Sequence, residues 1–191
     1  MNHKIFLILC GMVMVVLLSA CASKSLPSED IQASFVTVHH SVLHIPVNAT
    51  YQWSPGFSRQ VVAGKLHHVD MWGLLKQAIE AEMQAKGYRQ ISMAGQADIN
   101  ISFVAALTSA LDDTAIQQQY GLVPGLIVNR VASGQYEKGT LIFDVINPKT
   151  QRLVWRTAGQ ALATLEAIPK ADRKARIAAF VKKLLAFLPE T

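Results

Sequence analysis

Cysteine is scarce in this sequence, and charged and aromatic residues are few. The only cysteines among the 191 residues are Cys10 and Cys21. Two thiols cannot build a disulfide framework, and a zinc cluster would need more ligands close together. The sequence also lacks long low-complexity tracts and internal repeats, which excludes disordered, collagen-like and repeat architectures. A chain of this length can bury the core of one ordinary domain without such support.

The charged residues are unevenly placed as well as few. They make up 16% of the chain, against 51% hydrophobic residues, and the formal net charge is +5. Much of the hydrophobic excess lies in one N-terminal run, and most of the positive charge lies in one C-terminal segment. The composition therefore indicates an exported, compact domain with a local basic face rather than a basic protein.

The N-terminus has the pattern of an export signal. Lys4 precedes an apolar run over residues 5–18, which is shorter than the roughly 20 residues that a transmembrane helix needs. The segment Leu18-Ser19-Ala20-Cys21 then resembles the lipobox of bacterial lipoproteins, in which the cysteine is acylated and becomes the first residue. We therefore predict a signal peptide over residues 1–20, lipidation of Cys21, and a flexible tether within residues 21–33.

Lipidation of Cys21 makes the membrane the first predicted partner. Several acyl chains together give stable anchoring, whereas one chain holds a protein only weakly. Ala22 and Ser23 follow the cysteine in place of aspartate. By resemblance to lipoprotein sorting in Gram-negative bacteria, this favours the outer membrane, with the domain facing the periplasm.

Residues 34–191 are expected to form a single α/β domain. Asp70 is placed to cap a helix over residues 69–86 and Gly87 to end it. The turn residues Asn147-Pro148-Lys149-Thr150 predict an antiparallel hairpin. The order of elements predicts a two-layer sandwich, with a mixed, mostly antiparallel sheet and two helices packed on one face. The predicted strands cover residues 35–38, 42–45, 51–53, 97–104, 139–146 and 153–158, and the second helix covers residues 169–188.

Two further features of the pattern concern the middle of the domain. Ile99, Ile101 and Phe103 alternate with polar residues, which predicts a strand with one face in water. Residues 105–135 combine short apolar runs with turn residues, and a connection of this length is usually either functional or mobile.

Six short segments carry a resemblance to a known family. They are Tyr51-Gln52-Trp53-Ser54-Pro55, Ala85-Lys86-Gly87-Tyr88, Ala97-Asp98-Ile99, Lys138-Gly139-Thr140-Leu141 with Asp144, Leu153-Val154-Trp155-Arg156, and Phe187-Leu188-Pro189. In this order they resemble DUF4136, a family of bacterial lipoproteins defined as a domain of unknown function. The resemblance covers residues 35–189 and implies an envelope location and this fold, but no activity. Asn147 and Thr157 depart from the family pattern, as does the composition of residues 105–135.

The histidines and acids offer little chemistry. Adjacent strand residues point to opposite faces, so neighbouring histidines cannot share a metal, and we predict no metal site, cofactor or catalytic residue. The sequence has no GxSxG, P-loop or GxGxxG motif and no thiol left after lipidation. The aromatic residues on strands are expected to pack in the core. The groups considered are the histidines His39, His40, His44, His67 and His68, the acids Asp98, Asp112, Asp113 and Asp144, and the aromatics Tyr51, Trp53 and Trp155.

The last helix carries the most suggestive surface. An exported protein meets little nucleic acid, so we expect no nucleic-acid partner and consider an envelope protein or an anionic envelope component instead. The first hypothesis is thus a non-enzymatic, lipid-anchored binding or accessory module. The alternatives are a small-ligand binder or hydrolase using residues 105–135, and an inert structural lipoprotein. The predicted partner surface consists of Lys170, Arg173, Lys174, Arg176, Lys182 and Lys183.

Overall fold

The computed structural model describes residues 32–39, 45–54, 61–62, 66, 69–92, 96–127 and 134–191. The predicted signal peptide, Cys21 and nearly all of the tether lie outside these ranges, as do residues 42–44 of the second predicted strand. Within them, no helix has both the length and the apolar character needed to cross a membrane.

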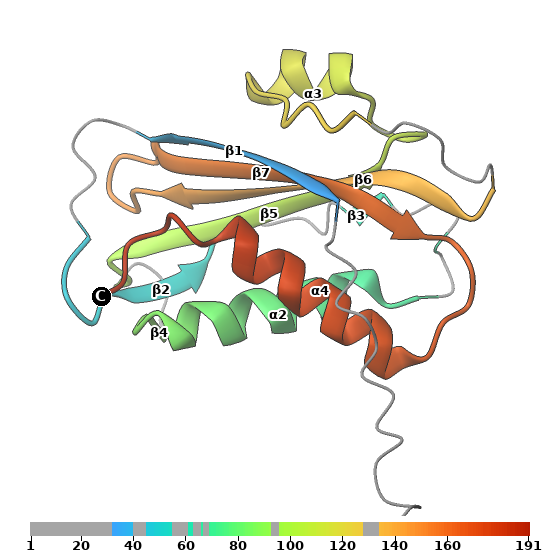
Figure 1. The fold of residues 1–191 in the computed structure, drawn as a ribbon. Coiled ribbons are helices and arrows are strands. Elements are labelled where there is room, and N and C mark those ends of the chain that lie inside the picture. Colours follow the sequence, from blue (N-terminus) through green and yellow to red (C-terminus); the bar gives the residue numbers. More distant parts are fainter. Residues whose placement is uncertain are drawn as a thin grey trace, which may run out of the picture. The chain divides into compact units, whose positions relative to one another are not determined.

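A mixed sheet forms the centre of the domain (Figure 1). Its strands lie in the order β1-β7-β6-β5-β2-β4, and β3 also pairs with β5. The pairs β1–β7, β7–β6 and β6–β5 are antiparallel, whereas β2 and β3 run parallel to β5, and β4 runs parallel to β2. The elements are β1 (Ala33–His39), β2 (Thr50–Trp53), β3 (Val61–Val62), α2 (Met71–Ala85), β4 (Arg89–Gln90), β5 (Ile99–Leu107), α3 (Asp113–Tyr120), β6 (Tyr136–Ile146), β7 (Leu153–Thr164) and α4 (Lys170–Leu184).

Local signals in the sequence place the ends of several elements correctly. The Asp70 carboxylate accepts a hydrogen bond of 2.9 Å from the Gly73 N–H at the start of α2. Gly87 follows the end of α2 with φ of +92°, a conformation that glycine adopts without strain. In the β6–β7 hairpin, the Asn147 Oδ1 accepts hydrogen bonds from the backbone N–H groups of Lys149 and Thr150 at 2.9 and 3.1 Å. The predicted helix caps and hairpin are therefore confirmed.

Helices α2 and α4 cover one face of the sheet (Figure 1). The apolar layer between them contains Phe103, Phe143 and Trp155 from the strands, and Ile79 and Val181 from the helices. The Phe143 and Trp155 rings meet edge to face at 72°, with centroids 6.1 Å apart. This layer is the main core of the domain.

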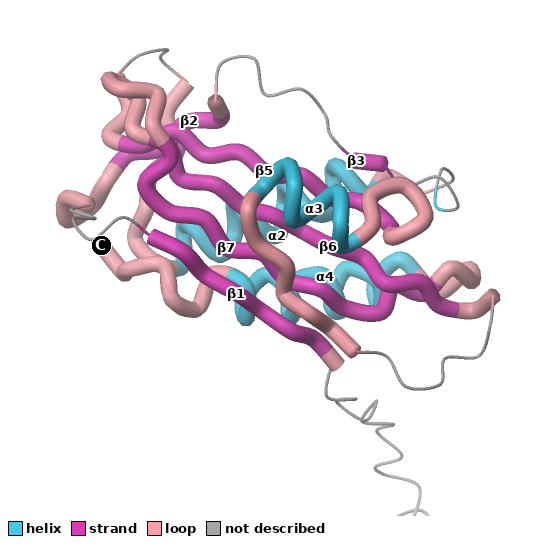
Figure 2. The backbone as a smooth tube through the Cα atoms, turned by 90° about the horizontal axis from the view of Figure 1, so that it is seen from above, coloured by secondary structure: helices cyan, strands magenta, loops and turns pink. Residues whose placement is uncertain are grey.

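The opposite face of the sheet carries a third layer, so the two-layer prediction is not confirmed. Helix α3 lies across this face (Figure 2), where Ile116 packs with Leu122, Ile142 and Ala158. The prediction rested on two helices because α3 is short and its sequence is mostly polar. One buried isoleucine and the apolar residues after the helix give α3 an apolar contact with the sheet.

The predicted wet face of strand β5 is only partly exposed, because Ser102 and Val104 are half-buried and Asn100 is buried. Asn100 lies on the side of β5 facing the third layer and is only 1% exposed. Its Oδ1 accepts a hydrogen bond of 2.9 Å from Gln52 Nε2 on the neighbouring strand. Alternation identified the strand, but Asn100 pairs with a neighbouring side chain instead of meeting water.

Candidate functional site

The four acids considered for catalysis lie at separate places in the fold. Asp98 accepts hydrogen bonds of 2.7 Å from both the backbone N–H and the hydroxyl of Thr50. These bonds, the backbone one first, lower the pKa of Asp98. Asp112 caps α3 by accepting a hydrogen bond of 2.8 Å from the Ala115 N–H. Both carboxylates therefore serve local structure.

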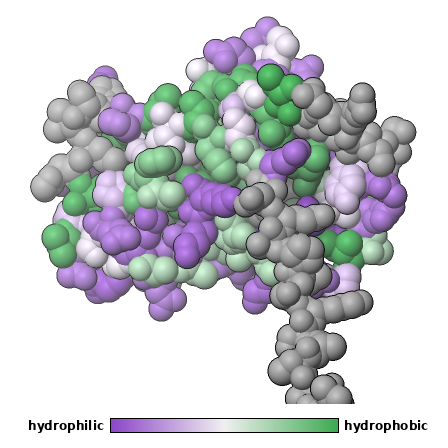
Figure 3. All heavy atoms as spheres, viewed as in Figure 1, coloured by the Kyte–Doolittle hydropathy of each residue, from purple (hydrophilic) through white to green (hydrophobic). Residues whose placement is uncertain are grey.

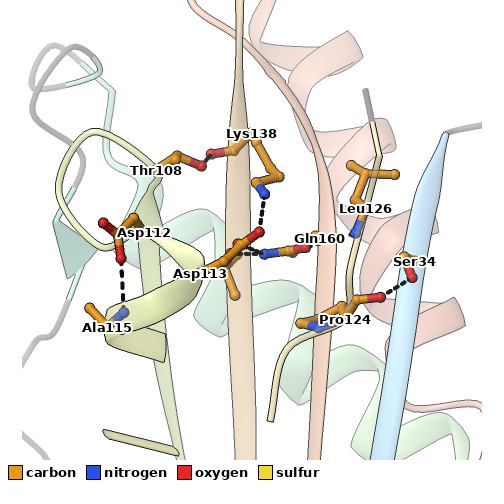
Figure 4. A network of polar contacts seen from close by, with 10 residues as sticks. Ser34, Thr108, Asp112, Asp113, Ala115, Pro124, Leu126, Lys138 and Gln160 are labelled. Carbon is orange, nitrogen blue, oxygen red and sulfur yellow. Dashed lines mark hydrogen bonds and ion pairs between the residues drawn. The ribbon is translucent and has the colours of Figure 1, made fainter. Parts of the chain in front are cut away.

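Asp113 belongs to a polar network between α3 and the sheet (Figure 4). Its carboxylate accepts from Lys138 Nζ at 2.6 Å and from Gln160 Nε2 at 2.7 Å. Gln160 is fully buried, and its Oε1 accepts from the Leu126 N–H at 3.0 Å. Gln160 therefore links β7 both to α3 and to the segment that follows α3.

Asp144 is engaged by an arginine on the same face of the sheet. Arg156 Nε and Nη2 each donate to one carboxylate oxygen of Asp144 at 2.6 Å, and Nη1 donates to the Tyr120 carbonyl at 2.9 Å. The guanidinium also lies 5.3 Å from the centroid of the Tyr120 ring. The hydrogen bonds to Asp144 raise the pKa of Arg156. This cluster holds the end of α3 against the sheet.

The acids, taken together, do not form an acid–base pair around a common cavity. Among the described residues, the apolar pocket between the sheet and the helix pair has none of Asp98, Asp112, Asp113 and Asp144 in its lining. Residues 105–127 of the long connection instead form the end of β5, helix α3 and a segment packed on the sheet, and residues 128–133 lie outside the described ranges.

Of the five histidines considered for metal binding, the structure describes only His39. His40, His44, His67 and His68 lie outside the described residues, and His39 ends β1 at the surface. The described part of the chain contains no group of three side chains suited to hold a metal ion.

The strand aromatics pack largely as predicted. Tyr51 and Trp155 are 2% and 1% exposed and belong to the main core. Burial, with a smaller contribution from the Glu80 charge, raises the pKa of Tyr51 to about 12. Trp53 is half-buried, with its indole N–H donating to Glu80 Oε1 at 3.0 Å.

Helix α4 presents lysines around an outward ridge of alanine. We call the exposed residues Lys170, Lys174, Lys182 and Lys183 the α4 lysine face. The alanine ridge, which lies among these lysines, consists of Ala171, Ala175, Ala178 and Ala179 of α4 and Ala186 in the turn that follows, all exposed. Phe187, in the turn after α4, is 75% exposed. Figure 3, which views the molecule from the same side as Figure 1, shows hydrophilic and hydrophobic residues mixed on this side rather than one continuous apolar patch.

Arg173 is not part of that exposed face, although the sequence analysis included it. It is 8% exposed, and its guanidinium donates to the carbonyl oxygens of Thr164 at 3.2 Å and Glu166 at 2.9 Å. Arg176, one turn further on, is half-buried. Burial, followed by the nearby Arg176 charge, lowers the pKa of Arg173. Helical spacing from the outward ridge turns both arginines toward the sheet.

Sequence reasoning missed an apolar pocket between the sheet and the helices α2 and α4. Its volume is about 140 Å³, and Arg173 and Arg176 contribute to its lining. The available signal was a set of small residues, Ala105, Gly139, Ala161 and Ala163, at inward-facing strand positions. Only the pairing of the three strands shows that these positions are neighbours.

The structure defines an α/β domain with a mixed sheet and helices, and its described residues assemble no catalytic group. The family model described as a domain of unknown function, DUF4136, matches residues 48–190. The chain therefore belongs to the DUF4136 family, as its sequence segments predicted. Comparison with curated proteins found no relative.

Solved structures similar to this chain come from several bacteria. A DUF4136 family protein from Bacteroides thetaiotaomicron is 14% identical, with 84% of this chain and 99% of that chain covered and a TM-score of 0.49. A PelC dodecamer from Paraburkholderia phytofirmans is 11% identical, with 81% and 95% covered and a TM-score of 0.46. A PDZ domain protein from Parabacteroides distasonis is 13% identical, with 83% and 36% covered and a TM-score of 0.45.

Proposed function

We propose that this chain is a lipid-anchored protein of the bacterial outer membrane that has no enzymatic activity and binds an anionic envelope surface through α4. The lipobox-like segment ending in Cys21 supports the anchor and the periplasmic location. The four acids considered for catalysis are engaged in hydrogen bonds and ion pairs within the fold, which lends no support to a hydrolase. The observation that carries the proposal is the α4 lysine face with its ridge of alanine and the exposed Phe187.

The chemistry of α4 suits a flat anionic surface better than a shaped protein partner. The alanine side chains are short, so the longer lysine side chains extend beyond them and can contact one flat surface. Each lysine close to an anionic membrane contributes about 1 kcal/mol, an attraction that salt screens. Phe187 supplies an apolar group that can enter the lipid interface beside those lysines.

The first experiment compares vesicles of phosphatidylcholine with and without phosphatidylglycerol. The full chain carries Cys21→Ala, so that no acyl group contributes, and any binding through the apolar N-terminus is the same for every variant. We expect preference for the anionic vesicles at low salt. Reversing Lys174 and Lys182 to glutamate should weaken that preference by about 2 kcal/mol or more.

The matched control reverses two cations elsewhere. Lys149→Glu with Arg152→Glu makes the same charge change on exposed residues of the β6–β7 turn. Equal losses in the two double variants would show a net-charge effect and contradict a specific role of α4. If the chain with unaltered α4 lysines shows no preference for anionic vesicles, the proposed role of α4 is contradicted as well.

The anchor is tested separately in intact cells. Cys21→Ala should move the chain from the membrane fraction to the soluble or precursor fraction, and crosslinking with mass spectrometry should lose its envelope neighbours in that variant. Retention of the same membrane position and neighbours would contradict the lipid anchor. A reproducible protein neighbour that depends on the α4 lysines would replace the lipid surface as the partner.

A further inference from the structure

The pocket between the sheet and the helix pair is the strongest unassigned feature of the domain. It lies on the core side of β5, β6 and β7, near the N-terminal halves of α2 and α4. Its volume is about 140 Å³. The walls are mainly apolar side chains, contributed by Leu75, Leu107, Leu141, Ile177 and Phe180 among others.

The pocket exists because the inward-facing strand residues change size along the sheet. Large residues such as Phe103 and Trp155 fill one end of the apolar layer, whereas Ala105, Gly139 and Ala161 line the other end. A Cβ built on Gly139 would lie at ordinary contact distances, 3.6 Å or more, from its nearest neighbours. A methyl group therefore fits at Gly139, and the small residues around it leave the adjoining pocket open.

Phe180 cannot easily fill this space, because its ring is held elsewhere. The ring packs against Phe35 of β1, with centroids 5.3 Å apart. Both rings lie over Gly159, whose missing side chain permits their close approach. This contact between Phe180, Phe35 and Gly159 holds α4 close to the sheet at one side of the pocket. The pocket next to the contact stays open.

Two arginines give one end of the apolar pocket a positive charge. Arg173 and Arg176 are one turn apart on α4, and both contribute to the lining. Two hydrogen bonds from Arg173 to the carbonyl oxygens of Thr164 and Glu166 hold its guanidinium in place. Among the described residues, the pocket lining contains these two cations and no acidic side chain, so it favours an anionic ligand group over a cationic one.

We propose that this pocket binds a small amphipathic anion, with its hydrocarbon part among the small strand residues and its carboxylate beside Arg176. An engineered apolar cavity of about 150 Å³ in another protein stays dry and binds benzene, so a pocket of this size accepts a hydrocarbon group of roughly six carbons. The class of ligand is thus a short-chain fatty carboxylate. This inference concerns the buried side of α4 and does not depend on the α4 lysine face.

The test uses methyl NMR on the full Cys21→Ala chain with octanoate as the probe. We expect saturable shifts at the methyl groups of Ala105, Ala161 and Ala163, which line the pocket. Octanol and octylammonium have the same number of carbon atoms as octanoate but a neutral and a positive head group, so comparing the three affinities shows the effect of the head-group charge. Octylammonium should bind at least fivefold more weakly than octanoate, because its charge repels the arginines.

Two substitutions separate the apolar part of the site from its charge. Arg176→Gln should weaken octanoate binding at least fivefold and leave octanol binding unchanged. Gly139→Val should fill the pocket and abolish the shifts from both ligands. If that variant fails to fold, Gly139→Ala, whose added methyl has room, should still weaken both ligands.

Three results would overturn the inference. One is octanoate shifts that do not saturate or that spread over the surface rather than over the pocket methyls. Another is equal octanoate affinity in the unaltered chain and in Arg176→Gln, which would show that the pocket does not recognise the carboxylate of the ligand. The third is unchanged binding in a folded Gly139 variant. Lys174→Glu with Lys182→Glu serves as the control and should bind octanoate as before, whether or not the chain binds vesicles.

Discussion

At the level of single residues, Gln160 connects the third layer to the sheet. Its amide nitrogen donates to Asp113 at 2.7 Å and to Thr140 Oγ1 at 3.2 Å, and its oxygen accepts from the Leu126 N–H. Burial by itself raises the pKa of Asp113, but the hydrogen bonds from Lys138 and Gln160 outweigh it and lower the pKa. The ionised form of Asp113 is therefore the one that holds α3.

The pKa of Asp113 predicts how acid affects α3. Its lowered pKa in the native state means that its stabilisation is complete above the unfolded value, about 3.9, and is lost as the pH falls through the native value. Because Asp113 is 41% exposed on the side chain, we expect Asp113→Asn to cost only about 0.5–1 kcal/mol at pH 7. Urea unfolding should show this cost shrinking toward pH 3.

The control measures the cost of Asp113→Asn at the same pH values in a chain that also carries Lys138→Met. Without the lysine, the pKa of Asp113 lies nearer its usual value, so the cost of Asp113→Asn should be smaller and should depend less on pH. A cost that stays constant from neutral to acid pH in the unaltered background would contradict the role given to the ionised carboxylate.

At the level of elements, two strand glycines differ in their effect on the packing of α4 against the sheet. A Cβ on Gly159 would lie 2.7 Å from both the Phe180 Cζ and the Phe35 Cδ1. Gly139, on the neighbouring strand β6, has no such close neighbour. One glycine is thus needed for helix packing, whereas the other leaves a pocket.

A matched pair of substitutions tests this difference. Gly159→Ala must displace two aromatic rings, so we expect a loss of about 1–3 kcal/mol in the free energy of unfolding. Gly139→Ala has room for the methyl and loses less chain entropy on folding, so we expect a gain of up to about 1 kcal/mol. Denaturant unfolding of both variants measures the two effects, and equal effects would contradict this packing.

At the level of the whole molecule, the last residues of the chain are tied to the end of α2. Lys86 Nζ donates to the Leu188 carbonyl at 3.0 Å, and the Tyr88 hydroxyl donates to the Pro189 carbonyl at 2.9 Å. The Thr191 N–H donates to the Lys86 carbonyl at 2.9 Å. Burial raises the pKa of Tyr88, so its hydroxyl keeps its proton as a donor. These bonds join segments about a hundred residues apart in sequence.

Removing the Tyr88 hydroxyl tests the contribution of this contact. Tyr88→Phe leaves the ring in the core and deletes one hydrogen bond, so we expect a loss of about 1 kcal/mol. Hydrogen exchange at the Thr191 amide should become faster because the terminal segment opens more often. Tyr136→Phe, at an exposed position, should change neither quantity, and equal effects of the two substitutions would contradict the proposed tie.

Several local features of this chain could be predicted from the sequence, because their causes act over a few residues. Asp70 and Gly87 bound α2 through backbone groups within one turn, and Pro148 lies in a turn whose geometry depends on its neighbours. Six short segments were enough to predict the DUF4136 family, which the family model confirms. The lipobox-like segment at Cys21 is likewise local, and its lipidation stays a prediction.

Only the tertiary structure decided which side chains meet across the sheet. Helical spacing placed Arg173 among the basic residues of α4, but contacts with the carbonyl oxygens of Thr164 and Glu166 bury it. Alternation placed Asn100 in water, but Asn100 is buried and its side chain accepts a hydrogen bond from Gln52 of β2. The pocket arises where Gly139 of β6 pairs with Ala161 of β7. The sequence by itself determined caps, turns and periodicity, because these depend on near neighbours, whereas burial and cavities depend on strand register and on which elements cover each face.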